Sequence, residues 1–307
     1  MPLNGVSPAF LIGAGRSGTT LLYKILSSHR AIGYLGNYQS RFPSQPWTGL
    51  LHRVPNIFPS LKRKFWFDDE GGAYFNEKRR LVNSLVPTPA EAEPVYTSSG
   101  VRLNSETNFV PTDYVATRLA HTFEVVRRTS GARVLLSKRT ANNRRLTVIS
   151  AIFPEARYIH LVRDGRSVAH SLLKVGWWND HVLYWSGLTP RQMVEQGVNP
   201  LDLAARNWSE EMGSLEQGIC MIDARHILEV RYEALLANPR TELTRMLTFL
   251  GVSEIEDGEF WRIVDSLGLK VRSESWETAW SDADRERVTL LQAPTLRRWG
   301  FAMGSAQ

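Results

Sequence analysis

The sequence has 307 residues, of which 43% are hydrophobic and 22% charged, and it carries a formal net charge of +6 at pH 7. This composition excludes a disordered or fibrous chain and permits one large α/β core without disulfide support. The excess of positive charge favours an anionic ligand, although a nucleic acid or a membrane surface would suit it equally well.

A single cysteine, Cys220, excludes an intrachain disulfide and indicates a reducing compartment. No apolar run approaches the roughly 18 residues of a membrane span. The first residues lack the basic and apolar regions of a secretion signal. We therefore expect a cytoplasmic protein with no membrane span.

The stretch Ala9–Ser28 predicts a buried strand, a glycine-rich turn and a helix. An apolar run at 9–12 precedes Gly13–Gly18, and a helical pattern follows over Thr19–Leu26. The unpaired N–H groups and the dipole of a helix N-terminus attract an anion, and glycine lets the backbone approach a phosphate closely. The turn therefore predicts an anion-binding loop.

Two common nucleotide-binding motifs match this turn incompletely. The spacing G-x-G-x-x-G over 13–18 is that of a dinucleotide fingerprint, but no acidic residue precedes Asp68 to bind the ribose. A Walker A loop would have a lysine where Thr19 stands, which weakens the case for a P-loop kinase. The cation of this turn is Arg16 instead.

Residues 33–75 and 87–100 lack a helical or strand period. The first stretch is rich in Gly, Pro and aromatic residues and predicts loops and short helices that cap a cleft. The second predicts an exposed, mobile connection. Thr112 then favours the start of a helix that we expect to end near Arg128.

Further strands are expected at 134–137, 158–162 and 227–230, and helices at 143–153, 167–174 and 239–250. This alternation predicts a mostly parallel sheet with helices on both faces. Polar residues follow each strand, among them Lys138, Arg163 and Tyr232. Since ligands of such sheets bind at the carboxyl ends of the strands, we expect the site there.

A second cationic turn follows the strand at 158–162. Arg163 leaves that strand, and Ser171 lies on the helix that comes next. A guanidinium and a hydroxyl would hold one phosphate from two sides. Together with Gly13–Thr20, this turn predicts a ligand with two separated anionic groups.

Three segments resemble the sulfotransferases that use 3′-phosphoadenosine-5′-phosphosulfate (PAPS). The run RSGTT over 16–20 resembles the 5′-phosphosulfate loop of that family. The stretch from 135 to 173 resembles its second region, with a lysine at a strand end, FPEA, a strand and RDGRSVAHS. That last run is typical of the tyrosylprotein-sulfotransferase-like branch and its bacterial relatives. RYEALLANP over 231–239 is similar to the family's Y-E-x-L-x-x-x-P segment.

The resemblance implies an α/β fold, a P-loop-like three-layer α/β/α arrangement with a central parallel sheet. It implies one sulfotransferase domain over 1–307, with loop-rich insertions at about 33–100 and 176–200. The activity implied is transfer of a sulfuryl group from PAPS to a hydroxyl acceptor, without a metal. The acceptor would be a carbohydrate, a lipid-linked or another small molecule, ahead of a protein tyrosine.

Other partners and activities stay open at this point. No nucleic acid polymer is expected as a partner, and a homodimer is compatible with the pattern. A non-catalytic nucleotide- or polyanion-binding protein on the same fold is one alternative activity, and a P-loop kinase is another.

Carried over position by position, the resemblance assigns roles to individual residues. The 5′-phosphosulfate falls to Arg16, Ser17, Gly18, Thr19 and Thr20, the 3′-phosphate to Arg163 and Ser171, and the adenine to Tyr232. Lys138 would lie near the bridging oxygen and offset the charge that develops on the leaving phosphate.

The base that takes the proton of the acceptor hydroxyl is missing from both of its family positions. Cytosolic members have a histidine where this chain has Thr140, and tyrosylprotein enzymes have a glutamate where it has Asn37. The replacement we expect is Glu106, in a run that resembles an E-x-H-F-F segment of glycan-modifying sulfotransferases. His52 and His181 are the other candidates.

Two further segments are candidates for contact with the ligands. The aromatic density of Gly176–Trp185 is typical of a sugar or aromatic-acceptor cleft, and also of a core or interface segment. Arg297–Trp299 is expected to close over the nucleotide.

Overall fold

The computed structural model describes residues 7–68, 85–102, 109–270 and 275–303. Within them, one five-stranded sheet has the order β2-β3-β1-β4-β5, and every neighbouring pair is parallel. The strands are β1 (Ala9–Ile12), β2 (Ile32–Tyr34), β3 (Val134–Lys138), β4 (Arg157–Val162) and β5 (Ile227–Arg231). The predicted parallel sheet is therefore confirmed, and β2 is the strand that the sequence pattern did not indicate.

Strand β1 lies at the centre because it is apolar on both faces. Its four residues are all buried, and Phe10 is level with Ser137 of β3 on one side and Tyr158 of β4 on the other. Successive side chains of a strand point to opposite faces, so a strand covered on both sides has no polar alternation. This explains why the short run at 9–12 predicted a buried strand.

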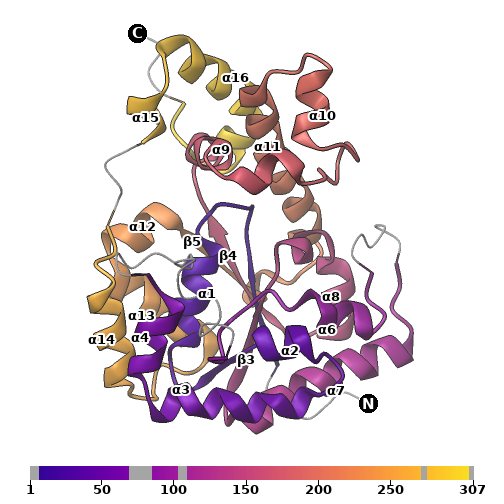
Figure 1. The fold of residues 1–307 in the computed structure, drawn as a ribbon, viewed down its shortest axis with the longest axis vertical. Helices are drawn as coiled ribbons and strands as arrows, with labels where there is room; N and C mark the ends of the chain where they lie inside the picture. The colour runs from indigo at the N-terminus through magenta and orange to yellow at the C-terminus, as the bar shows by residue number, and fades with distance from the viewer. Residues whose placement is uncertain (1–6, 69–84, 103–108, 271–274, 304–307) are drawn as a thin grey trace.

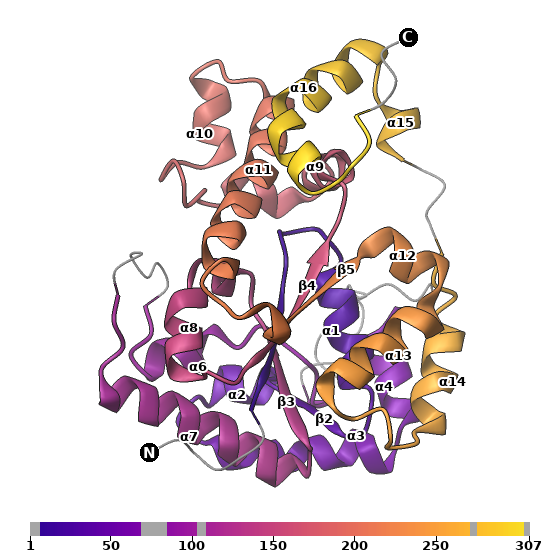
Figure 2. The same cartoon turned by 180° about the vertical axis from the view of Figure 1, so that it is seen from behind.

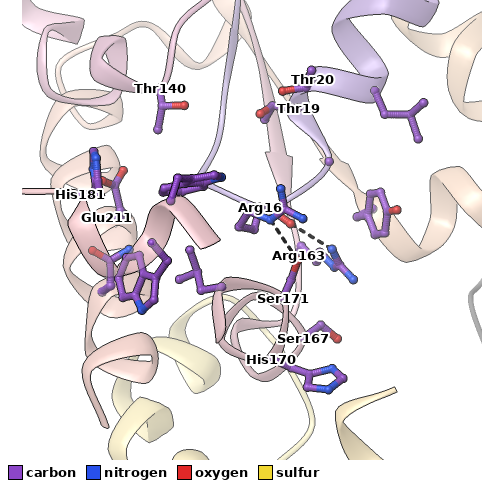
Figure 3. A pocket seen from close by; sticks show the side chains of 18 of the residues that line it. Arg16, Thr19, Thr20, Thr140, Arg163, Ser167, His170, Ser171, His181 and Glu211 are labelled. Atoms are coloured by element: carbon purple, nitrogen blue, oxygen red, sulfur yellow. Dashed lines mark hydrogen bonds between the residues drawn. The ribbon is translucent and has the colours of Figure 1, made fainter. Parts of the chain in front are cut away.

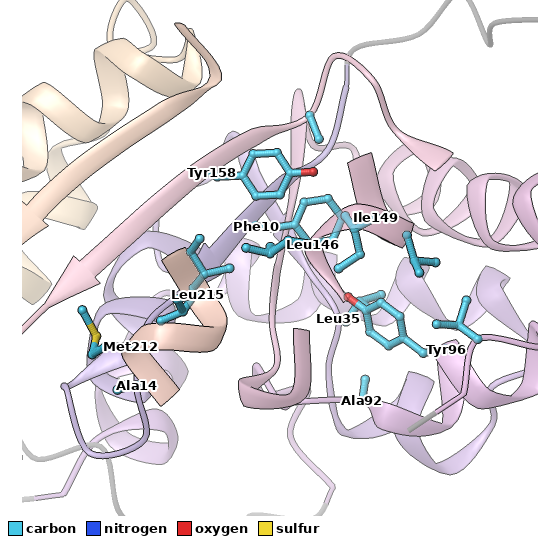
Figure 4. Packing of buried hydrophobic residues seen from close by; sticks show 14 of the residues in the cluster. Phe10, Ala14, Leu35, Ala92, Tyr96, Leu146, Ile149, Tyr158, Met212 and Leu215 are labelled. Atoms are coloured by element: carbon cyan, nitrogen blue, oxygen red, sulfur yellow. The ribbon is translucent and has the colours of Figure 1, made fainter. Parts of the chain in front are cut away.

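Helices cover both faces of the sheet (Figures 1 and 2). One face carries α1 (Thr19–Ser27), α4 (Ser60–Trp66), α13 (Pro239–Leu250) and α14 (Gly258–Ser266). The other carries α6 (Glu93–Ser98), α7 (Asp113–Ser130) and α8 (Leu146–Ile152). Leu11 of β1 packs in the first cluster, and Phe10 in the second, where its ring stacks on Tyr158 at 5.6 Å (Figure 4).

A further group of helices lies beyond the carboxyl ends of the strands (Figure 1). It consists of α9 (Gly165–Leu173), α10 (Pro190–Glu195), α11 (Pro200–Ile219), α15 (Trp276–Ala279) and α16 (Asp282–Arg298). Gln292 of α16 donates from Nε2 to the carbonyls of Gly165 and Ala205, both over 3.1 Å. A Cβ at Gly165 would lie 2.6 Å from Cζ3 of Trp208, so only glycine lets α9 and α11 approach this closely.

The remaining elements are short. They are α2 (Asn37–Arg41), η1 (Pro46–His52), α3 (Arg53–Ile57), η3 (Thr140–Arg144), η4 (Gly176–Asp180), η5 (Ala224–His226) and α12 (Tyr232–Ala237). The helix expected at 143–153 is divided, since its start belongs to the 3₁₀ turn η3 and α8 follows. No helix in the described ranges is long and apolar enough to cross a membrane.

The helix-end predictions are confirmed where the signal is local. Thr112 caps α7, because its Oγ1 accepts a hydrogen bond from Val115 N over 3.4 Å. Helix α13 has the predicted bounds, with Pro239 in its first turn and Gly251 at φ 71° after its last residue.

Candidate active site

A pocket of about 840 Å³ opens at the carboxyl ends of the strands. Its walls come from the glycine-rich turn, the residues after β3 and β4, and helices α9, η4, α11 and α12 (Figure 3). Every chain segment that the sequence analysis placed at a strand end contributes to it. The site is therefore where the parallel topology predicts it.

The turn before α1 has the conformation of an anion loop. Gly18 is the N-cap of α1 at φ 92°, and as glycine it makes no side-chain cap hydrogen bond to the first N–H groups of that helix. Arg16 also has a positive φ of 68°, which is uncommon outside glycine. Ser17 is fully buried, and its hydroxyl has no hydrogen-bond partner in the part of the chain that the structure describes. A buried unsatisfied hydroxyl beside a helix N-terminus fits an anionic group.

The two cationic turns are in direct contact. Arg16 donates from Nε to Ser171 Oγ over 3.0 Å, and Arg163 donates from NH1 to the carbonyl of Arg16 over 2.9 Å (Figure 3). The hydroxyl of Ser171 thus meets Arg16, although the sequence analysis paired it with Arg163. The turns form one continuous cationic wall, since α9 folds back over the end of β4.

Arg163 is held between this wall and an aromatic ring. Its guanidinium carbon lies 4.5 Å from the ring centroid of Tyr232, and burial lowers the pKa of Arg163 below its usual value. Tyr232 in turn packs against the turn, because a Cβ at Gly18 would come within 2.7 Å of its Cδ2. Asp164 pairs with Arg166, with NH2 and Oδ2 separated by 2.6 Å.

Lys138, the last residue of β3, lines the pocket and is paired with Glu91. Its Nζ contacts Glu91 Oε1 and donates to Thr20 Oγ1 over 3.3 Å. Arg139 pairs with the other Glu91 oxygen, and Thr140 Oγ1 donates to Oε1 over 3.5 Å. Burial by itself would raise the pKa of Glu91, but the two cations outweigh it and lower that pKa to about 2.

Glu91 is a pocket residue that the sequence analysis missed. It lies in the 87–100 stretch, whose predicted exposure is wrong, because α6 forms there and buries Val95 and Tyr96. Tyr96 OH hydrogen-bonds Ser137 Oγ over 2.7 Å, which ties α6 to β3. The sequence signal that could have predicted this buried helix is the apolar pair Val95 and Tyr96 within an otherwise polar run.

The far side of the pocket contains a second buried carboxylate, Glu211 (Figure 3). It accepts hydrogen bonds from Asn143 Nδ2 and Arg144 NH1, both over 3.1 Å. Burial raises the pKa of Glu211, while Arg144 opposes that shift. Burial also lowers the pKa of His181, helped by the nearby arginines. Arg144 lies 4.2 Å from the ring centroid of Tyr184.

Several residues that the sequence analysis predicted for the site do not line the pocket or lie outside the described residues. Glu106, the predicted base, lies outside the described residues. His52 is buried away from the pocket, where it hydrogen-bonds Gln39 and stacks on Tyr34 at 4.0 Å. Burial lowers the pKa of His52 to about 3. No described residue of 33–68 lines the pocket, so the predicted cap over the cleft is wrong for that part.

The expected contribution of Arg297–Trp299 is also wrong. These residues do not line the pocket. Arg298 pairs with Glu216, and the ring of Trp299 packs 5.0 Å from His160. By contrast, the aromatic run after α9 does line it, through Trp177, Trp178 and Tyr184. Among the described residues, no three His, Cys, Asp or Glu side chains are grouped as metal ligands would be.

Comparison with curated proteins finds two similar relatives. Both are the omega-hydroxy-beta-dihydromenaquinone-9 sulfotransferase Stf3, from Mycobacterium bovis and Mycobacterium tuberculosis, and each is 25% identical over 124 residues. The match covers 40% of this chain and 30% of each relative, so the chain spans less than a third of their length.

Solved structures show the same fold. Sulfotransferase STF9 from Mycobacterium avium superimposes with a TM-score of 0.61 at 15% identity, covering 96% of this chain and 77% of that one. Sulfotransferase STF1 from Mycobacterium tuberculosis gives a TM-score of 0.53 at 16% identity, covering 94% and 76%. A family model described as "Sulfotransferase family" matches residues 8–257. That range includes all five strands and both cationic turns, and the chain belongs to the sulfotransferase family.

Proposed function

We propose that this protein transfers a sulfuryl group from PAPS to the hydroxyl of an acceptor. The contact between Arg16 and Ser171 carries the proposal, because it joins the two cationic turns at one pocket. The buried, unpartnered hydroxyl of Ser17 fits a donor with a charged 5′ group. As the donor site, we assign the residues taken from the family resemblance: Arg16, Ser17, Gly18, Thr19, Thr20, Arg163, Ser171 and Tyr232.

Within this assignment, charge and shape divide the donor between the two turns. The N–H groups at the start of α1 and the Arg16 guanidinium would bind the 5′-phosphosulfate. Arg163 and Ser171 would bind the 3′-phosphate, with the hydroxyl of Ser171 bridging to Arg16. Tyr232 would approach the adenine while its ring lies against Gly18 and Arg163.

Lys138 would offset the charge on the leaving phosphate. Its Nζ lies 3.3 Å from Thr20 Oγ1, in the first turn of α1, where the 5′ end of the donor would bind. The transfer is an in-line displacement at sulfur, so positioned cations supply most of the catalysis. No metal is part of this proposal. Glu106 stays a prediction as the base, since nothing in the described residues tests it.

The acceptor side favours an apolar molecule with a hydroxyl group. On the side of the pocket that we assign to the acceptor, the lining includes the aromatic and aliphatic side chains of Trp177, Trp178, Val182, Leu183 and Tyr184. The curated relatives are named for a menaquinone derivative, which is a lipid. We therefore rank a lipid-linked or similar small acceptor above a carbohydrate and a protein tyrosine. We also place the reaction in the cytoplasm, in a single domain, with a homodimer as one possible assembly.

Differential scanning calorimetry with and without 3′-phosphoadenosine-5′-phosphate (PAP) tests the donor site. We expect PAP to bind and to raise the thermal midpoint by several degrees, because a ligand at 100 times its Kd adds about 2.7 kcal/mol. Arg163→Ala should abolish this shift, and Arg128→Ala, on the exposed side of α7, should keep it. Stabilisation by ATP–Mg²⁺ or NAD⁺ in place of PAP would overturn the proposal.

A further inference from the structure

Glu91 is the carboxylate next to the proposed leaving group. It lines the pocket, and 35% of its side chain is exposed. Lys138 bridges it to Thr20, at the N-terminus of α1, through an ion pair on one side and a 3.3 Å hydrogen bond on the other. One lysine side chain therefore separates this carboxylate from the loop assigned to the 5′-phosphosulfate.

Both family positions that lack a base in this chain contact Glu91 or the segment that carries it. Thr140 stands where cytosolic sulfotransferases have histidine, and its Oγ1 lies 3.5 Å from Glu91 Oε1. Asn37 stands where tyrosylprotein enzymes have glutamate. Its Nδ2 donates to Val86 O over 3.0 Å, and its Oδ1 accepts from Thr88 N over 3.1 Å. Asn37 thus fixes the chain just before Glu91.

The backbone holds this segment on both sides of Glu91. Before it, Ala90 N donates to Leu35 O over 3.0 Å, and Gly36 bridges to Pro89. After it, Glu93 pairs with the fully buried Arg145, whose NH2 lies 2.5 Å from Glu93 Oε1. The carboxylate of Glu91 is therefore presented to the pocket from a chain that is anchored at each end.

We propose that Glu91 is the general base of the transfer, and that donor binding readies it by drawing Lys138 from the carboxylate to the 5′-phosphate. This inference rests on the proposed sulfuryl transfer. It replaces the expected Glu106 with a residue that the fold brings to the reacting atoms. Lys138 would serve the donor and the base in turn.

The step balances as a displacement at sulfur. A bond forms between the acceptor oxygen and sulfur while the bond from sulfur to the bridging oxygen breaks, and the bonding pair stays on the 5′-phosphate. The hydroxyl proton goes to a Glu91 oxygen, which later returns it to solvent. Lys138 offsets the charge on the phosphate that leaves and re-pairs with Glu91 once PAP departs.

Charges around Glu91 explain why the exchange matters. Among the described residues, Lys138 and Arg139 form ion pairs with Glu91, and the buried phenol of Tyr23 interacts with it electrostatically. Arg139 is shared with Glu93, whose Oε2 lies 2.8 Å from its Nε. With Lys138 on the donor, one shared cation remains, so the pKa of Glu91 should rise and the carboxylate should become a stronger base. Without donor, the ion pair with Lys138 keeps the Glu91 carboxylate a weak base.

Proton uptake on PAP binding tests the exchange without knowledge of the acceptor. Calorimetry at about pH 5, in two buffers of different ionisation enthalpy, should show greater proton uptake in wild type than in Glu91→Gln. Glu195→Gln, the same change at an exposed carboxylate that does not line the pocket, should keep the wild-type uptake. Glu91→Gln should bind PAP at least as tightly as wild type. Equal uptake in all three proteins would overturn the exchange.

Surrogate acceptors test the base itself. With an aliphatic alcohol, Glu91→Gln should lose roughly 100-fold or more in transfer from PAPS, the usual contribution of a general base. With 4-nitrophenol at mildly alkaline pH, where the phenol is already ionised, the loss should be small. A merely structural role would lower both rates alike and so refute the assignment. Failure of wild type to bind PAP would instead defeat the proposed function.

Discussion

The Nε of Arg16 and the Oγ of Ser171 are 3.0 Å apart although 155 positions separate them in the sequence. Arg16 lies in the turn after β1, and Ser171 on the helix after β4, so the contact depends on the adjacency of these two strands. It joins the loop assigned to the 5′-phosphosulfate with the helix assigned to the 3′-phosphate.

Ser171→Ala should weaken PAP binding by about tenfold or more with little change in stability. The variant removes one hydroxyl that would bond a charged group, and such a bond is worth about 1.5–3 kcal/mol. Ser167→Ala, on the same helix and also in the pocket wall, is the control that should retain near wild-type affinity. Calorimetric titration measures both, and equal affinities would argue against Ser171 as a donor ligand.

Gly18→Ala should destabilise the fold and impair PAP binding together. A side chain at φ 92° is strained, and its Cβ would collide with the ring of Tyr232. We expect a loss of about 1–3 kcal/mol in unfolding free energy. Gly15→Ala is the matched control, since nothing lies within 4 Å of a Cβ there. Urea denaturation of the two variants compares them directly.

Asn37→Ala should lower the rate of sulfuryl transfer about tenfold while PAP affinity stays near that of wild type. Its side chain fixes the backbone at Val86 and Thr88, and so positions Glu91 from outside the pocket lining. The readout is a fall in kcat with an aliphatic alcohol and an unchanged Kd for PAP. Asn37→Asp keeps the acceptor for Thr88 N and should recover part of the loss. A drop in PAP affinity would point to a wider disruption.

Trp177→Ala should raise the KM for an apolar acceptor several-fold without affecting PAP. The side chain lines the pocket and is 51% exposed, so its removal should leave the fold intact. Trp47→Ala is a matched control, because Trp47 is 59% exposed and does not line the pocket. Steady-state kinetics with a series of alcohols would show whether the effect grows with chain length. An unchanged KM would remove Trp177 from the acceptor wall.

Acid should destabilise the protein in part through His160. Burial, helped by Arg231, lowers the pKa of His160 to about 3, against 6.5 for the free side chain. The unfolded chain therefore binds this proton first, and stability falls from about pH 6.5 towards pH 3, by at most about 1.4 kcal/mol per pH unit. In His160→Phe, the urea concentration at the unfolding midpoint should change less between pH 7 and pH 5 than it does in wild type. A slope equal to that of wild type would contradict this assignment.

The sequence was informative wherever the cause of structure is local. The apolar run before Gly13, the cap at Thr112 and the Pro239 to Gly251 pattern each predict an element that the structure confirms. Strand β2 could not be predicted, because three residues are too few to show a period and their pairing with β3 decides them. Burial on both sheet faces follows from the continuous apolar strands.

The residues of the candidate site can be divided in the same way, into those with a local sequence signal and those without one. The cationic turns and Lys138 could be read from motifs, since strand ends of a parallel sheet meet at one edge. Glu91 could not, because its partner Lys138 is 47 positions away and an acidic residue in a polar run has no local signature. The motifs therefore indicated the family and the residues that we propose for the donor. Only the tertiary structure placed Glu91 against Lys138, because Asn37 and α6 fix a segment whose own sequence predicts a loop.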